Sequence, residues 1–129
     1  MDVVQVMVIH ANDIPTFRAG RTAVAGLATR RRGAERIMLW RVSTDPGAEG
    51  RAHRHDAEEV VLVLAGSGRL LEAGGEHPFG PGDVLVIPEN LLHRVAASPV
   101  EPCEYVAAMG TDTHHFTELG EEMDLPWSD

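Results

Sequence analysis

Two short segments of the chain are apolar at every position. Residues 60–64 read Val-Val-Leu-Val-Leu, and residues 84–87 read Val-Leu-Val-Ile. A strand with one solvent-exposed face alternates between apolar and polar residues. Unbroken apolar runs of this length therefore predict strands that are covered on both faces. We expect one face of residues 60–64 to line a barrel interior together with Glu59. The other face should lie against a second sheet or a partner subunit.

Further strands are predicted on both sides of these two. Residues 3–9 are mostly β-branched and apolar, and residues 37–42 form a similar run with Trp40 in the middle. Gly74-Gly75 suits a hairpin loop, and Pro81-Gly82 suits a tight turn. Nine or ten short strands with almost no helix predict an all-β fold, a double-sheet jelly-roll barrel with a ligand cavity inside.

Length and composition fit one domain. The 129 residues can bury a core of their own, and 13 glycines and 8 prolines supply the turns of an all-β fold. We expect a single domain over residues 1–129, with the barrel at about 38–105. An acidic tail should follow at about 110–129, with one helical turn at 118–123 that Pro126 stops.

The net charge of −9 argues against nucleic acid, whose phosphates need a basic surface. Arg30-Arg31-Arg32 is the one basic run, and it predicts a solvated turn or, alternatively, a contact for an anionic group. No signal-peptide pattern and no membrane-length apolar run is found. Because Cys103 is the only cysteine, no intrachain disulfide is possible. We therefore expect a soluble cytoplasmic protein, with no membrane partner.

Four residues form a candidate metal site. His53 and His55 are two apart, so on an extended strand both imidazoles point to the same side. Glu59 follows four residues later, and His93 ends the turn after the second apolar run. Imidazoles and a carboxylate in this combination suit one divalent ion per chain: Fe, Mn, Ni, Co, Cu or Zn. Alone, a His-x-His pair is more often two polar residues on an exposed face.

The two segments that hold these residues resemble the two motifs of the cupin superfamily. The first motif is G-x5-H-x-H-x3-E-x6-G, and Gly47, His53, His55, Glu59 and Gly66 occupy all its fixed positions. The second motif is G-x5-P-x-G-x2-H-x3-N, which is matched at Gly82, Pro88 and His93. Asn90 replaces the glycine and Ala97 the asparagine. The first change is mild, since asparagine tolerates left-handed backbone better than most residues.

The resemblance implies the jelly-roll barrel and a metal held by His53, His55, Glu59 and His93. It implies a reaction only loosely, because small cupins include dioxygenases, isomerases and polyketide-type cyclases. A metal-dependent enzyme, first of all a dioxygenase, is our main hypothesis, and a Lewis-acid isomerase or cyclase with Glu59 as base is the alternative. A non-catalytic module that binds a small ligand or a metal is the hypothesis from a different class.

Three residues are candidates for contact with a small-molecule substrate. Trp40 and Tyr105 are large amphipathic side chains, and Arg51 has the strand parity of His53. Each could instead be structural or exposed to solvent. The two unbroken apolar runs also predict a homodimer.

Overall fold

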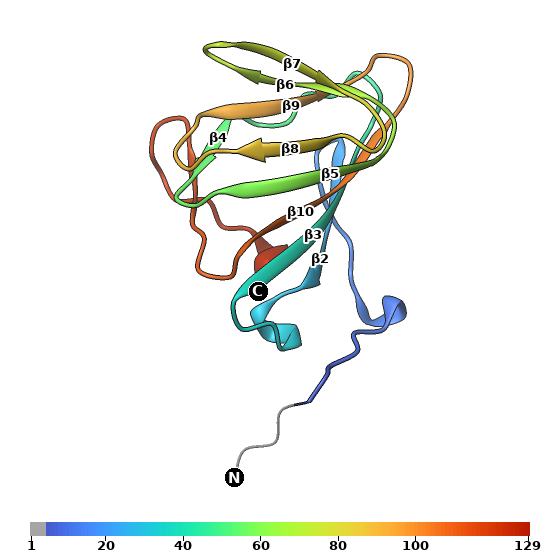
Figure 1. The fold of residues 1–129 in the computed structure, drawn as a ribbon, viewed down its shortest axis with the longest axis vertical. Coiled ribbons are helices and arrows are strands. Elements are labelled where there is room, and N and C mark those ends of the chain that lie inside the picture. The colour runs from blue at the N-terminus through green and yellow to red at the C-terminus, as the bar shows by residue number, and fades with distance from the viewer. Residues whose placement is uncertain (1–4) are drawn as a thin grey trace.

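A computed structural model describes residues 5–129 of the chain (Figure 1). Eleven strands and three short 3-10 helices make up its regular structure in this range. The strands are β1 Phe17–Ala19, β2 Thr22–Ala28, β3 Ile37–Thr44, β4 His53–His55, β5 Glu59–Ala65, β6 Gly68–Glu72, β7 Gly75–Phe79, β8 Val84–Ile87, β9 His93–Ala97, β10 Cys103–Gly110 and β11 His115–Thr117. The 3-10 helices are η1 Ala11–Asp13, η2 Arg30–Arg32 and η3 Pro126–Ser128.

The strands form two antiparallel sheets. The six-stranded sheet has the order β1-β2-β3-β10-β5-β8, and the five-stranded sheet has the order β11-β4-β9-β6-β7. Neighbours in each sheet are often distant in sequence, as β3, β10 and β5 are, which is the pattern of a jelly roll. The predicted all-β jelly-roll fold is confirmed. Among the described residues, none of the helices has the length and apolarity that a membrane crossing requires.

The core lies between the two sheets and follows the alternation of β5. Glu59, Val61 and Val63 face inward and are buried, as predicted for the barrel interior. Leu62 and its neighbours of the same parity, Val60 and Leu64, face outward and are exposed. Within residues 5–129, neither sheet covers this outer face. The prediction of burial on both faces therefore fails within one chain, because the second sheet packs only on the inner side.

The N-terminal segment also differs from its prediction. The sequence predicts a strand at residues 3–9, of which 3 and 4 lie outside the described part. Gln5 to Ile9 belong to no strand and extend from the barrel as an arm (Figure 1). Side chains of the right type are present, but no neighbouring strand among the described residues lies beside them.

The C-terminal segment is predicted to be a polar tail, yet residues 123–128 cross from one sheet to the other. We call them the C-terminal strap. At one end Met123 donates its N–H to the carbonyl of His115, 2.8 Å away, and at the other end η3 lies against β2. Pro126 begins the 3-10 turn of η3 instead of stopping a helical turn at 118–123, because proline fits the first position of a helix.

Two special backbone positions hold these segments in place. A β-carbon added at Gly26 would meet the carbonyl oxygen of Trp127 at less than 3.0 Å, so the strap can approach β2 only over a glycine. Asn90 has a positive φ of 63°, as its place in the second motif predicts, and its N–H bonds the carbonyl of His55 at 2.7 Å. This bond ties the turn before β9 to the strand that holds two of the candidate ligands.

Candidate metal centre

Three histidines on neighbouring strands of the five-stranded sheet lie close together. His53 and His55 lie at the two ends of β4, and His93 begins β9, where it is the direct register partner of His53. One ring nitrogen from each of the three lies within 4.8 Å of the other two. The ring centroids of His53 and His93 are 4.5 Å apart, and those of His55 and His93 are 5.0 Å apart. The predicted convergence of these three side chains is thus present.

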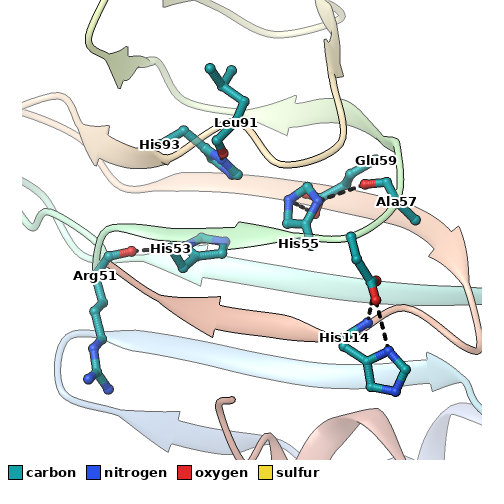
Figure 2. Close-up of polar contacts among 9 residues, drawn as sticks. Arg51, His53, His55, Ala57, Glu59, Leu91, His93 and His114 are labelled. Atoms are coloured by element: carbon teal, nitrogen blue, oxygen red, sulfur yellow. Dashed lines mark hydrogen bonds and ion pairs between the residues drawn. The ribbon is translucent and has the colours of Figure 1, made fainter. Parts of the chain in front are cut away.

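Each of the three rings is oriented in the same way by the backbone. Nδ1 of His53 lies 2.8 Å from the carbonyl of Arg51, Nδ1 of His55 lies 2.9 Å from that of Ala57, and Nδ1 of His93 lies 2.8 Å from that of Leu91. A carbonyl can only accept, so each Nδ1 carries a proton and each Nε2 is the nitrogen left for a ligand. Figure 2 shows these contacts and the rings turned toward a common space.

Glu59 adds a carboxylate to this group. It begins β5, is buried, and places Oε2 3.0 Å from Nε2 of His55. Burial alone would raise the pKa of Glu59, but the close contact with His55 and its charge outweigh burial and lower that pKa. Burial likewise works against a charged His55, and Glu59 reverses the balance, so the pKa of His55 is raised. Wherever Nε2 of His55 is protonated, that proton must leave before the nitrogen can bind an ion.

The neighbouring carboxylate, Glu58, is not part of the group. It is exposed, whereas Glu59, the next residue, is buried. It therefore serves as a natural comparison for Glu59.

The other two histidines are held neutral. Burial lowers the pKa of His53, and burial together with the neighbouring charge of His53 lowers the pKa of His93 to about 4. At neutral pH both rings are therefore uncharged, which is the form that ligates metal. The donor set of imidazoles with one ionised carboxylate fits a divalent transition ion.

A fourth histidine, His115, is missed by sequence reasoning. It lies on β11 directly opposite His55, with ring centroids 5.3 Å apart, and stacks on Trp40 at 5.1 Å. Its Nε2 is buried without a hydrogen-bond partner among the described residues, and burial lowers its pKa to about 4. Its nitrogens lie outside the 4.8 Å group of three. His115 lies next to the three histidines only because β11 pairs with β4. No motif spacing in the sequence predicts that pairing.

A cavity of about 460 Å³ opens beside the histidines, and its walls are mostly apolar. Of the three predicted substrate residues, Trp40 and Tyr105 line it as large side chains of the barrel interior. Arg51 also contributes to the lining, although its side chain is exposed and points away from the three rings (Figure 2). Burial strongly raises the pKa of Tyr105, and the charge of Glu59 raises it further, so the phenol stays protonated.

The strap closes the cavity on the side of β2. Met123, Leu125 and Trp127 all contribute to the lining, and the Trp127 ring meets Trp40 edge to face with centroids 5.8 Å apart. Cys103 is fully buried in a separate part of the core, as expected for a small apolar residue, and lies outside the metal cluster.

The fold and this histidine cluster agree with the result of comparison with protein families. Residues 40–109 match the family model described as "Cupin domain", which covers more than half of the chain. The chain belongs to the cupin family. The resemblance seen in the two sequence motifs is thereby confirmed.

Solved cupin structures support the same fold. The polyketide cyclase RemF from Streptomyces resistomycificus superposes with a TM-score of 0.75 at 22% identity, covering 96% of this chain and 89% of that one. A variant of oxalate decarboxylase from Bacillus subtilis gives a TM-score of 0.73 at 21% identity, over 85% of this cupin and 30% of the decarboxylase.

Among curated proteins, the cupin resembles plant auxin-binding proteins. Auxin-binding protein 1 of Arabidopsis thaliana is 29% identical over 92 residues, which is 67% of this chain and 46% of that protein. Auxin-binding protein T92 of Nicotiana tabacum is 28% identical over 127 residues, which is 92% of this chain and 59% of that protein. The chain thus spans about half the length of these relatives.

Proposed function

We propose that this cupin is a metal-dependent enzyme that acts on a small, largely apolar organic molecule. The observation that carries the proposal is the threefold use of one arrangement at His53, His55 and His93. Each Nδ1–H is bound to a backbone carbonyl, so that three Nε2 atoms are oriented before any ion arrives. Preset orientation of this kind is typical of metal ligands.

In this proposal His53, His55 and His93 hold one divalent ion, and Glu59 supplies the carboxylate. The donor atoms suit Fe, Mn, Ni, Co, Cu or Zn, without selecting one of them. When bound, the ion polarises a substrate oxygen, and a redox-active ion also supports reaction with dioxygen. The apolar cavity excludes water from the substrate and strengthens the electrostatic interactions within it.

A dioxygenase is the first candidate reaction. If Glu59 bound through one oxygen, the three imidazoles and this carboxylate would leave two positions of a six-coordinate ion for other ligands. Those positions would be available to a chelating substrate and to dioxygen, and the cavity beside the histidines has room for a small molecule.

An isomerase or cyclase is the second candidate, and the pair Tyr105 and Glu59 favours it. Tyr105 keeps its proton because burial raises its pKa, so its hydroxyl can donate a hydrogen bond to a substrate oxygen. Glu59 is ionised because its pKa is lowered, and it could act as the base if it left the metal. Such a pair suits proton transfer next to a carbonyl group. The structural similarity to a polyketide cyclase is consistent with this chemistry.

A binding module without turnover is the candidate from another class. The names of the curated relatives, which describe auxin binding, support it. Consumption of a substrate separates this candidate from both enzymes, because a binder only shifts the melting temperature of the protein.

The test is anaerobic loading of metal-free protein with Fe(II) or Zn(II), followed by a panel of enediols, β-diketones and phenols. Product formation and oxygen uptake are recorded, with His93→Ala as the metal-binding control. A dioxygenase consumes oxygen with Fe(II) and is inactive with Zn(II), which has no accessible redox change. Equal conversion with Zn(II) and without oxygen would replace the dioxygenase with the isomerase or cyclase. Ligand-induced stabilisation without conversion would refute both enzymes.

We also propose that the protein is a cytoplasmic homodimer. The outward side chains of β5 and β8 support dimer formation, because Val84 and Val86 join Val60, Leu62 and Leu64 in one exposed apolar area. Exposed apolar areas of this kind commonly mark protein contacts. Light scattering at micromolar concentration tests the assembly, and a monomer of about the chain mass, 14.0 kDa, would contradict it.

A further inference from the structure

The N-terminal arm, residues 5–9, is an apolar segment that pairs with no strand of the described chain. Val6 is 92% exposed and Val8 is 70% exposed, and the five residues carry no charge. Their composition is that of a strand, yet residues 10–129 offer them no strand pairing. An apolar strand segment in water lacks the burial that would stabilise it. The arm would therefore be stabilised by an apolar surface, and no strand of residues 10–129 lies beside it to supply one.

Within residues 5–129 the two sheets have four edges, of which three are protected against strand addition. Strand β7 contains Pro78 and the charged Glu76, β1 has three residues with Arg18 at its centre, and β11 is bridged from Phe116 to Glu122. Proline, charge, short length and added cover are the usual means by which proteins protect their edges.

Apart from its short length, strand β8 has none of these protections. It contains neither proline nor charge, and it forms the edge of the six-stranded sheet, so no strand of the described chain lies beside its outer N–H and C=O groups. Val84 and Val86 are 58% and 62% exposed. A free backbone edge and an apolar surface thus occur together at β8. Its four residues span about 13 Å and the arm about 17 Å, so the two segments match in length.

The arm of the same chain is poorly placed to cover β8. It leads into β1, which lies at the opposite edge of the sheet, five strand spacings or about 24 Å away. Met7 packs over Gly33, and Figure 1 shows the arm leaving the barrel at the end far from β8. A second copy of the chain can supply the strand instead.

We propose that the arm of one copy adds as an extra strand to β8 of a second copy, and that the second arm does the same in return. This reciprocal exchange gives a closed two-fold dimer, in which backbone hydrogen bonds and apolar side chains both contribute. The contact joins two uncharged segments, so it adds no charge repulsion between two chains that each carry a net charge of −9. The exchange rests on the homodimer proposed above and goes beyond it, since it assigns the segment that holds the copies together.

The first test uses charged substitutions on the two sides of the contact. Val8→Lys changes the arm, Val86→Lys changes the edge, and Val100→Lys is the control at an exposed valine of a distant loop. We expect each of the first two to raise the dimer dissociation constant at least tenfold in light scattering across a dilution series, while the control leaves it unchanged. A cooperative melt and retained metal binding establish that each variant is folded.

The second test identifies the exchange directly. Met7→Cys protein is mixed with Val86→Cys protein under mild oxidation, and Met7→Cys with Leu119→Cys is the control. Cys103 is fully buried and does not interfere. A disulfide between two different copies, formed only in the first mixture, supports the proposal. A dimer that Val8→Lys does not weaken, or equal cross-linking in both mixtures, overturns the exchange but leaves the homodimer standing. A monomeric full-length protein overturns both, and neither result bears on metal binding.

Discussion

Substitution of Gly26 by alanine tests the role given to the C-terminal strap. The added methyl group would overlap the carbonyl oxygen of Trp127 and lie 2.8 Å from Cγ2 of Thr29. The contact with Thr29 involves a side chain, whereas the Trp127 oxygen belongs to the backbone. Because Gly26 is buried within β2, whose neighbours are β1 and β3, the strap must move instead of the strand.

The cost follows from what that movement breaks. The edge-to-face contact of Trp127 with Trp40 contributes about 0.5–1.5 kcal/mol, and overpacking of a core typically costs about 1–3 kcal/mol. The loss of glycine's freedom in the unfolded chain offsets about 0.4–1 kcal/mol. We expect Gly26→Ala to lower the free energy of unfolding by about 2 kcal/mol, within a range of about 0.5–4 kcal/mol, and the melting temperature of metal-free protein by about 6–10 °C.

A double-mutant cycle separates the strap from other causes. Thermal and urea unfolding are compared for Gly26→Ala, for a chain shortened by the loss of residues 126–129, and for both changes together. In the shortened chain the alanine should be neutral or slightly stabilising, since its methyl group then meets no Trp127 backbone. Equal destabilisation by Gly26→Ala in the complete and shortened chains would refute the reasoning and assign the cost to β2 itself.

Three further predictions concern the site. Glu59→Gln should lower metal affinity at least about tenfold, measured by competition with a chromogenic chelator, while Glu58→Gln at the neighbouring position should leave it unchanged. Tyr105→Phe should retain the metal but reduce turnover about 10²–10⁴-fold if Tyr105 donates a proton to the substrate, as steady-state kinetics would reveal. Metal binding near pH 7 should release at most about one proton, because only His55 among the three histidines has a raised pKa. As the pH falls toward about 4, where the pKa of His93 lies, binding should release further protons. Metal affinity should therefore decline slowly at first and steeply near that pH. Calorimetry in buffers of different ionisation enthalpy counts these protons, and release of two or more at pH 7 would contradict the assigned pKa directions.

Much of the fold and of the metal cluster was predictable because the information is local. His53 and His55 share one strand face by parity, and the turn at Asn90 places His93 at the start of β9. The inward side of β5 could be read from Glu59 and the valines that follow it at the same parity. These features depend on spacing of a few residues and on backbone preferences of single positions.

The remaining features depend on long-range pairing, which spacing cannot reveal. His115 reaches the site because β11 pairs with β4, which lies far earlier in the chain. Trp127 reaches the cavity because Gly26, which has no β-carbon, leaves room for the strap. No sequence pattern links these two residues. The arm is predicted as a strand from its side chains alone, whereas a strand also needs a neighbour to accept its hydrogen bonds.

The central claim is that His53, His55 and His93 hold one divalent ion. It is tested most directly by elemental analysis of protein purified without chelator, comparing wild type with His53→Ala and His93→Ala. His77→Ala is the matched control, because His77 is an exposed histidine on β7. We expect about one divalent ion per chain in wild type and control, and a sharp loss in both site variants. Equal metal content in all four proteins would contradict it.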